Sequence, residues 1–190
     1  NAGWLEALQL SQLPNRYQLA IAYEAGEPTY GRVILSQFPI VEGSVMTFAQ
    51  KSTDCLKLDV LIHGERVTVY NIHPEVSINP KKFKQQEEDW AVLIKHIEQQ
   101  KPPLLLCGDF NLTPWHSLFK GFKQQFALTD AQSLFGYQFT FPVGLRWPTL
   151  LPIDNCMVSE PLRILKSQSG PALGSDHRSL LITIGLYHFQ

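Results

Sequence analysis

The chain has 190 residues, of which 44% are hydrophobic and 17% charged, and its formal net charge is −1. This length and composition are typical of one globular domain with a sizeable core. Proteins that hold long nucleic acids without sequence preference usually carry a basic excess, so the overall charge offers no support for that class. No apolar run approaches the roughly 18 residues that a membrane span needs.

The N-terminal part of the chain predicts a short helix followed by five strands. Trp4, Leu5 and Leu8 are spaced for one face of an amphipathic helix. Apolar patterns then predict strands at residues 17–24, 31–37, 44–50, 54–63 and 65–72. His63-Gly64-Glu65 lies between the last two and is typical of a hairpin turn.

Asn79 and Pro80 predict the cap and the first residue of a helix that continues to about Gln100. Its expected buried face consists of Phe83, Trp90, Leu93, Ile94 and Ile97. We therefore expect Trp90 in the core and not as a platform for a nucleic-acid base.

Two further features of the sequence allow more than one interpretation. Lys81, Lys82 and Lys84 fit a solvated helix face better than a local basic patch. A second helix is predicted from Pro114 to Phe122, with Thr113 as its cap and His116 on its surface.

The three cysteines, Cys55, Cys107 and Cys156, are odd in number and lie in apolar segments that resemble strands. Their spacing matches neither a disulfide framework nor a metal-ligand set. The sequence therefore predicts three buried free thiols.

A short apolar run at residues 104–107 predicts a buried strand that ends in Gly108, Asp109, Phe110 and Asn111. If the backbone stays extended, the side chains of Asp109 and Asn111 point to the same side. A simple turn at the end of a strand would also explain these residues. Two further clusters weaken that explanation, because Asp154-Asn155 opens another predicted strand and Asp176-His177 precedes a strand at residues 179–186.

Strands joined both by hairpins and by helices indicate an α/β fold with two packed mixed sheets and helices outside. In their order, the polar clusters resemble the endonuclease/exonuclease/phosphatase superfamily. The segments that carry the resemblance are 31–36 with Pro39-Ile40, 69–74, 108–114, 153–154 and 175–177. The resemblance implies the layered α/β sandwich of that superfamily, in a single domain over residues 1–190.

One part of the family pattern is not found in this sequence. The family's first strand carries an Asn, and its second ends in a Glu that binds the essential divalent cation. Residues 1–8 are similar to the helix that follows this Glu, so we expect the first sheet to be incomplete. An incomplete sheet would expose an edge through which the chain could self-associate.

The resemblance also implies roles for individual side chains. Asp109 would position or deprotonate the attacking water, and Asn111 would bind the scissile phosphate. His177 would donate to a phosphate oxygen while Asp154 orients its other ring nitrogen. His73 corresponds to the family's second active-site histidine.

Three more residues complete the expected site. Asp176 would help to hold Mg²⁺ or Mn²⁺, because hard cations favour carboxylate oxygens. Trp147 and Arg178 are candidate substrate contacts, and packing is an equally good explanation for Trp147.

The predicted function is divalent-metal-dependent hydrolysis of a phosphodiester, with DNA or RNA slightly ahead of other substrates. One alternative is a phosphoesterase that acts on phospholipids or small phosphoesters. A second alternative, from another class, is a catalytically silent fragment that serves as a binding or scaffolding module.

Overall fold

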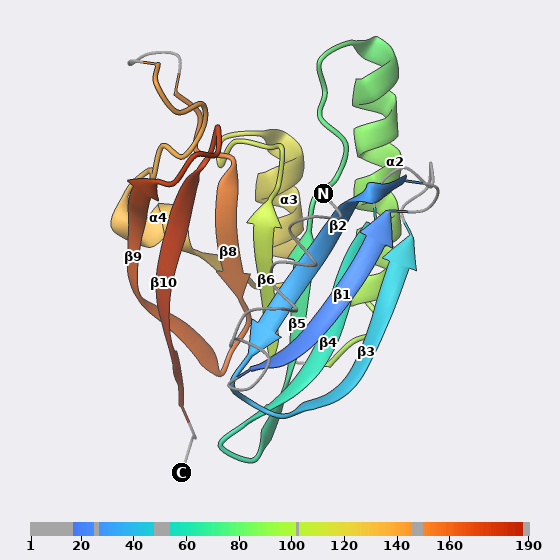
Figure 1. The fold of residues 1–190 in the computed structure, drawn as a ribbon, viewed down its shortest axis with the longest axis vertical. Coiled ribbons are helices and arrows are strands. Elements are labelled where there is room, and N and C mark those ends of the chain that lie inside the picture. The colour runs from blue at the N-terminus through green and yellow to red at the C-terminus, as the bar shows by residue number, and fades with distance from the viewer. Residues whose placement is uncertain (1–16, 25–26, 48–53, 102, 146–149, 188–190) are drawn as a thin grey trace. The chain divides into compact units, whose positions relative to one another are not determined.

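The computed structural model describes residues 17–24, 27–47, 54–101, 103–145 and 150–187 (Figure 1). The chain divides into two compact units, Asn1–Gln100 and Lys101–Gln190. Each unit has its own strands and helices. That the two together form one domain stays a prediction. The helix expected around Trp4 lies outside the described residues.

The first unit contains an antiparallel pair of strands and an antiparallel sheet of three strands. The pair is β1 (Gln18–Glu24) with β2 (Glu27–Ser36). The sheet has the order β3 (Ile40–Thr47), β4 (Asp54–Ile62) and β5 (Glu65–Ile72). All five predicted strands are present. β2 and β3 begin four residues earlier than predicted, because pairing with β1 and β4 continues through residues whose apolar pattern is weak.

The turn between β4 and β5 confirms the predicted hairpin. Ile62 pairs with Glu65, so the loop consists of two residues. His63 and Gly64 have φ angles of 52° and 90°, as the favoured two-residue hairpin turns require.

Helix α2 (Pro80–Ile97) starts where the sequence predicts. The Asn79 side chain accepts a hydrogen bond from the backbone N–H of Lys82 at 3.0 Å, which satisfies one of the free donors of the first turn. Trp90, Leu93 and Ile97 are buried in the core. His96 meets Tyr70 of β5 edge to face, with ring centroids 6.0 Å apart, so α2 packs on that strand.

The prediction was wrong for Phe83, which is 41% exposed. At this end of α2 two polar side chains are buried in place of apolar ones. The Asp89 side chain accepts from the backbone N–H of Glu75 at 3.0 Å, and the Gln86 side chain donates to the backbone carbonyl of Glu75 at 2.8 Å. The chain that follows β5 therefore lies on the helix face that Phe83 was expected to cover.

The second unit has a three-stranded antiparallel sheet and an antiparallel pair. The sheet has the order β6 (Leu104–Asp109), β8 (Asp154–Val158) and β7 (Thr129–Asp130). The pair is β9 (Leu162–Ala172) with β10 (Arg178–Leu186). β6, β8 and β10 are the three strands predicted next to polar clusters. β9 was not predicted, because its sequence is rich in Ser, Gln and Gly and shows no regular alternation.

The second unit also contains α3 (Ser117–Gln125) and the short α4 (Ala131–Phe135). The predicted start at Pro114 was wrong. Thr113 to His116 form a turn, in which the His116 N–H donates to the Thr113 carbonyl at 3.0 Å. His116, and not Thr113, caps α3, since its Nδ1 accepts from the N–H of Leu118 at 3.2 Å. No helix in the described ranges is long and apolar enough to cross a membrane.

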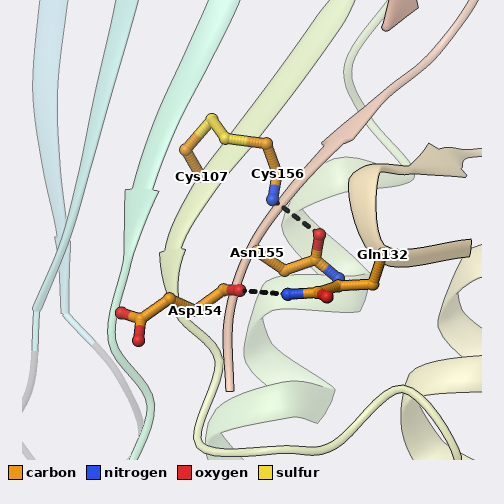
Figure 2. Close-up of a disulfide and its surroundings, with 5 residues drawn as sticks. All are labelled: Cys107, Gln132, Asp154, Asn155 and Cys156. Atoms are coloured by element: carbon orange, nitrogen blue, oxygen red, sulfur yellow. Dashed lines mark hydrogen bonds between the residues drawn. A yellow bond between two sulfur atoms is a disulfide. The ribbon is translucent and has the colours of Figure 1, made fainter. Parts of the chain in front are cut away.

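The prediction of three free thiols was wrong for two cysteines. Cys107 and Cys156 form a disulfide between β6 and β8 (Figure 2), whereas Cys55 is buried and lies outside this bridge. The two residues lie directly opposite each other, with a Cα–Cα distance of 4.2 Å. Such a short separation is typical of the non-hydrogen-bonded pairs of an antiparallel ladder, where side chains approach closely. Spacing along the sequence could not reveal this register.

Candidate active site

The candidate site in the second unit starts from the paired ends of β6 and β8. Asp109 ends β6, Asp154 begins β8, and the register places these two residues opposite each other. Gly108 has a φ angle of 147°, a conformation that favours glycine and lets the chain leave the strand. Two carboxylates that lie far apart in the sequence are therefore brought together by strand pairing.

His177 joins the two carboxylates from the residue before β10. Its Nδ1 lies 2.8 Å from Oδ2 of Asp154, and its Nε2 lies 3.9 Å from Oδ2 of Asp109. The hydrogen bond predicted between Asp154 and His177 is confirmed. The other ring nitrogen, Nε2, is the one that faces Asp109.

The segment at residues 140–143 holds His177 from its other side. The N–H of Arg178 donates to the Thr140 carbonyl at 2.8 Å, and the N–H of Val143 donates to the Asp176 carbonyl at 2.7 Å. Phe141 lies between these bonds, and its ring centroid is 4.5 Å from that of His177. The sequence analysis missed Phe141, although its alternation with Thr140 and Phe139 is a signal for an extended segment.

The sequence left both an extended backbone and a turn open at Asn111, and the structure has the turn. Asn111 has a φ angle of 47°, which Asn tolerates better than most residues, and its N–H donates to Oδ1 of Asp109 at 2.8 Å. The turn and the candidate site are thus both present. The same turn fixes one oxygen of Asp109 and leaves Oδ2 directed at His177.

Burial is the largest cause that raises the pKa of Asp109, which reaches about 6. The hydrogen bond from Asn111 opposes this shift, and the negative charges of Asp154 and Asp176 add to it. A carboxyl group with a pKa close to neutral pH can accept a proton efficiently.

The pKa of His177 shifts upward for a different reason. Its hydrogen bond to Asp154 is the largest cause, and the charges of Asp154, Asp109 and Asp176 act in the same direction. Burial opposes the shift. The carboxylates therefore favour the imidazolium form, which can donate a proton to an oxygen of a substrate.

Asp109, Asp154 and His177 also form a possible metal site. Each offers one ligand atom, and these atoms lie within 4.8 Å of one another. Asp176, the predicted metal ligand, is exposed and is not one of the three, but its charge raises the pKa of both Asp109 and His177. The converging carboxylates fit a hard divalent cation, which would offset their mutual repulsion.

The other predicted site residues have different positions. His73 follows β5 in the first unit, where its side chain is exposed and its carbonyl accepts from Arg32 at 3.2 Å. Arg178 is the exposed first residue of β10. Trp147 lies outside the described residues. The convergence of His73 with the cluster of the second unit stays a prediction.

Several solved structures share the fold of this chain at low sequence identity. The endonuclease/exonuclease/phosphatase from Bacteroides vulgatus is 14% identical, with a TM-score of 0.80 over 98% of this chain and 82% of that one. D. rerio TDP2 complexed with a single-strand DNA product is also 14% identical, with a TM-score of 0.75 over 96% and 82%. The mannosyl-6-phosphatase from Bacteroides thetaiotaomicron is 16% identical, with a TM-score of 0.68 over 97% and 89%.

These likenesses show an α/β fold in common, as the sequence analysis predicted. No curated protein matches the sequence. A family model does, since residues 1–177 match that of the Endonuclease/Exonuclease/phosphatase family. This match extends over nearly the whole chain and contains every predicted site residue except Arg178. The chain therefore belongs to the endonuclease/exonuclease/phosphatase family.

Proposed function

We propose that this chain hydrolyses phosphodiester bonds with the help of a divalent cation, Mg²⁺ or Mn²⁺. The family and the structural neighbours indicate hydrolysis of phosphodiesters or phosphate esters. The observation that supports our proposal most directly is the group of Asp109, Asp154 and His177, whose ligand atoms lie within 4.8 Å of one another.

In this proposal Asp109 positions the attacking water and accepts its proton. Burial raises the pKa of Asp109 to about 6, so the carboxylate form is present at neutral pH and is a stronger base than an exposed Asp. Asn111 lies two residues further along in the same turn and hydrogen-bonds the scissile phosphate.

His177 donates from Nε2 to an oxygen of the phosphate. Its Nδ1 is fixed 2.8 Å from Asp154, so this hydrogen bond sets both the ring orientation and the tautomer. His73 would assist at the same phosphate as the second histidine of the site.

Asp176 and the neighbouring carboxylates would hold the cation. The proximity of Asp176 to Asp109 and His177 is supported by its effect on the pKa of both groups. When bound, the cation would neutralise negative charge on the phosphate.

We propose nucleic acid as the substrate slightly ahead of phospholipids and small phosphoesters, with Trp147 and Arg178 as contacts. The DNA product bound to D. rerio TDP2 favours this order. The mannosyl-6-phosphatase of Bacteroides thetaiotaomicron favours a small phosphomonoester instead. The net charge of −1 gives no additional support to a nucleic-acid substrate.

The test compares three substrates with purified 190-residue protein: a single-stranded DNA oligonucleotide, p-nitrophenyl phosphate and p-nitrophenyl phosphorylcholine. We expect cleavage of the oligonucleotide that requires Mg²⁺ or Mn²⁺ and stops on addition of EDTA. The His177→Ala variant should lose this activity. Glu160→Gln, at an exposed position after β8, should keep it.

Cleavage of p-nitrophenyl phosphate alone would show that the substrate is a phosphomonoester and not a phosphodiester. Turnover that His177→Ala does not impair would show that the site is misassigned. A catalytically silent module remains the alternative from another class. Titration calorimetry separates the two, because our proposal requires Mg²⁺ to bind and Asp176→Asn to weaken that binding.

A further inference from the structure

Strand β8 begins at Asp154, but β7 pairs only with its C-terminal end. β7 pairs with β8 only at two positions, Asp130 with Met157 and Thr129 with Val158. After Asp130 the chain turns into α4. The backbone groups of β8 at residues 154–156 therefore need other partners on this edge.

Side chains replace the missing strand at this edge. The N–H of Cys156 donates to Oδ1 of the neighbouring Asn155 at 2.8 Å. The carbonyl of Asp154 accepts from Nε2 of Gln132, a residue of α4, at 2.9 Å (Figure 2). Gln132 thus supplies the hydrogen bond that a longer β7 would otherwise make.

The whole carboxamide of Gln132 is used and is shielded from water. The residue is 1% exposed. Its Oε1 accepts from the N–H of Gln138, and Oε1 of Gln138 accepts from the N–H of Ser169 in β9 at 2.8 Å. Gln132 therefore joins α4, the start of β8 and the segment at Gln138, and it has little freedom to move.

Gln132 bonds the backbone carbonyl of Asp154, whereas the Asp154 carboxylate bonds His177. Figure 2 shows the Asp154 side chain directed away from Gln132, and Oδ2 of that side chain bonds Nδ1 of His177 at 2.8 Å. On the other edge of β8, the Cys107–Cys156 disulfide fixes the register in which Asp154 faces Asp109. The position of Asp154 is thus determined from both edges of its strand.

We propose that Gln132 is a positioning residue of the active site. By holding the Asp154 carbonyl, it keeps the Asp154 carboxylate in place to orient His177. This inference rests on the proposed function, in which Asp154 and His177 act together. Gln132 itself touches neither the substrate nor the reacting atoms, so its effect would be exerted through Asp154. Misplacement of a reacting group by about 1 Å can cost 100-fold in rate.

The test replaces Gln132 with Met, which has a similar length and no hydrogen-bonding group. Gln86→Met is the matched control. Gln86 is also buried on a helix and donates from Nε2 to a backbone carbonyl, that of Glu75, at 2.8 Å. Both variants lose a buried hydrogen bond to a backbone carbonyl, and Gln132→Met also loses the bond from the N–H of Gln138, so both should lose thermal stability.

Two readouts separate a positioning role from a structural one. In Gln132→Met we expect kcat for DNA cleavage to fall about 10- to 100-fold with KM changed less than about 2-fold. We also expect the NMR signal of the His177 Nδ1–H, the proton bonded to Asp154, to shift or disappear. Gln86→Met should retain both kcat and this signal. If Gln132→Met does not fold, Gln132→Asn keeps a carboxamide at this position but is one methylene too short to hold both the Asp154 carbonyl and the N–H of Gln138.

The proposal is overturned if the Gln132 variant keeps the wild-type kcat and the His177 signal while it loses as much stability as the control. The NMR readout does not depend on turnover. If wild-type protein cleaves none of the substrates, the proposed function fails, and a changed His177 signal still shows that Gln132 positions Asp154. An unchanged signal would then reject the positioning role as well.

Discussion

Asp109 and Asp154 face each other across β6 and β8, and the ring of His177 reaches both of their carboxylates. Two carboxylates so close together disfavour each other's ionisation unless a proton or a cation intervenes. Burial is the largest cause that raises the pKa of Asp109, and the charge of Asp154 adds to it. The hydrogen bond to Asp154 is the largest cause that raises the pKa of His177.

The first prediction concerns the charge of Asp109. Asp109→Asn should abolish hydrolysis, because an amide cannot accept the proton of water. It should leave the free energy of unfolding unchanged or raise it by roughly 1–3 kcal/mol at pH 7, since a partly buried charge is removed and the bond from Asn111 can be kept. Activity assays and urea denaturation in EDTA measure the two effects.

Asp130→Asn provides the opposite control. The buried carboxyl of Asp130 bonds Lys123, which helps to lower its pKa, so removal of this charge should destabilise the protein. If Asp109→Asn destabilises as much as Asp130→Asn, the energetic cost of the buried Asp109 charge was overestimated.

The second prediction concerns pH. The hydrogen bond to Asp154 raises the pKa of His177 above 6.5, so the folded state binds this proton more tightly than the unfolded chain does. The resulting stabilisation is fully present below pH 6.5 and is lost as the pH rises through the folded pKa. The stability difference between wild type and Asp154→Asn should therefore shrink toward alkaline pH. Urea denaturation from about pH 5.5 to about pH 9 measures it, and a constant difference would contradict the prediction.

The third prediction concerns the cysteines. Unfolded but unreduced protein should show one reactive thiol, that of Cys55, and reduction should raise the number to three. Replacement of both Cys107 and Cys156 by Ala should cost about 2–4 kcal/mol of stability, because the bridge closes a long loop. Thiol titration and thermal unfolding test this, with Cys55→Ala as the control. Three reactive thiols before reduction would show that the bridge does not form.

The fourth prediction concerns the core of the first unit. Trp90 is fully buried, so Trp90→Ala should cost roughly 3–5 kcal/mol. Phe83→Ala on the same helix should cost far less, because Phe83 is 41% exposed. Equal losses in urea denaturation would contradict the packing described for α2.

The fifth prediction concerns self-association. β1 and β2 form a sheet of only two strands in the described part of the first unit, and open sheet edges favour pairing with another chain. We expect light scattering to detect dimers or larger assemblies as the protein concentration rises. A monomer at every concentration would reject this prediction.

The sequence predicts elements well where the signal is local. Asn79 and Pro80 define the start of α2 because a cap acts on its own first turn. The hairpin at His63 and Gly64 is equally local. The strand β9 was missed because its partner β10, and not its own apolar pattern, holds it in place.

The residues of the candidate site also differ in whether the local sequence predicts them. Asp109, Asp154 and His177 could be predicted because each lies in a motif of the family. Gln132, Phe141 and the Cys107–Cys156 pair could not, since their contacts depend on strand register and on segments far away in the sequence. Spacing also left the backbone of Asn111 open between an extended conformation and a turn, because its left-handed conformation depends on the hydrogen bond to Asp109.

The disulfide covalently links the two strands that carry Asp109 and Asp154 of the candidate site. Cys107 and Cys156 are 49 positions apart, and the closed ring between them contains Asp109, Asn111 and Asp154. A protease that cuts one peptide bond inside this ring releases no fragment, because the bridge still joins the two pieces. Nicked protein would therefore migrate as one species on a non-reducing gel and as two after reduction, with both carboxylates retained on one covalently connected molecule until the bridge is reduced.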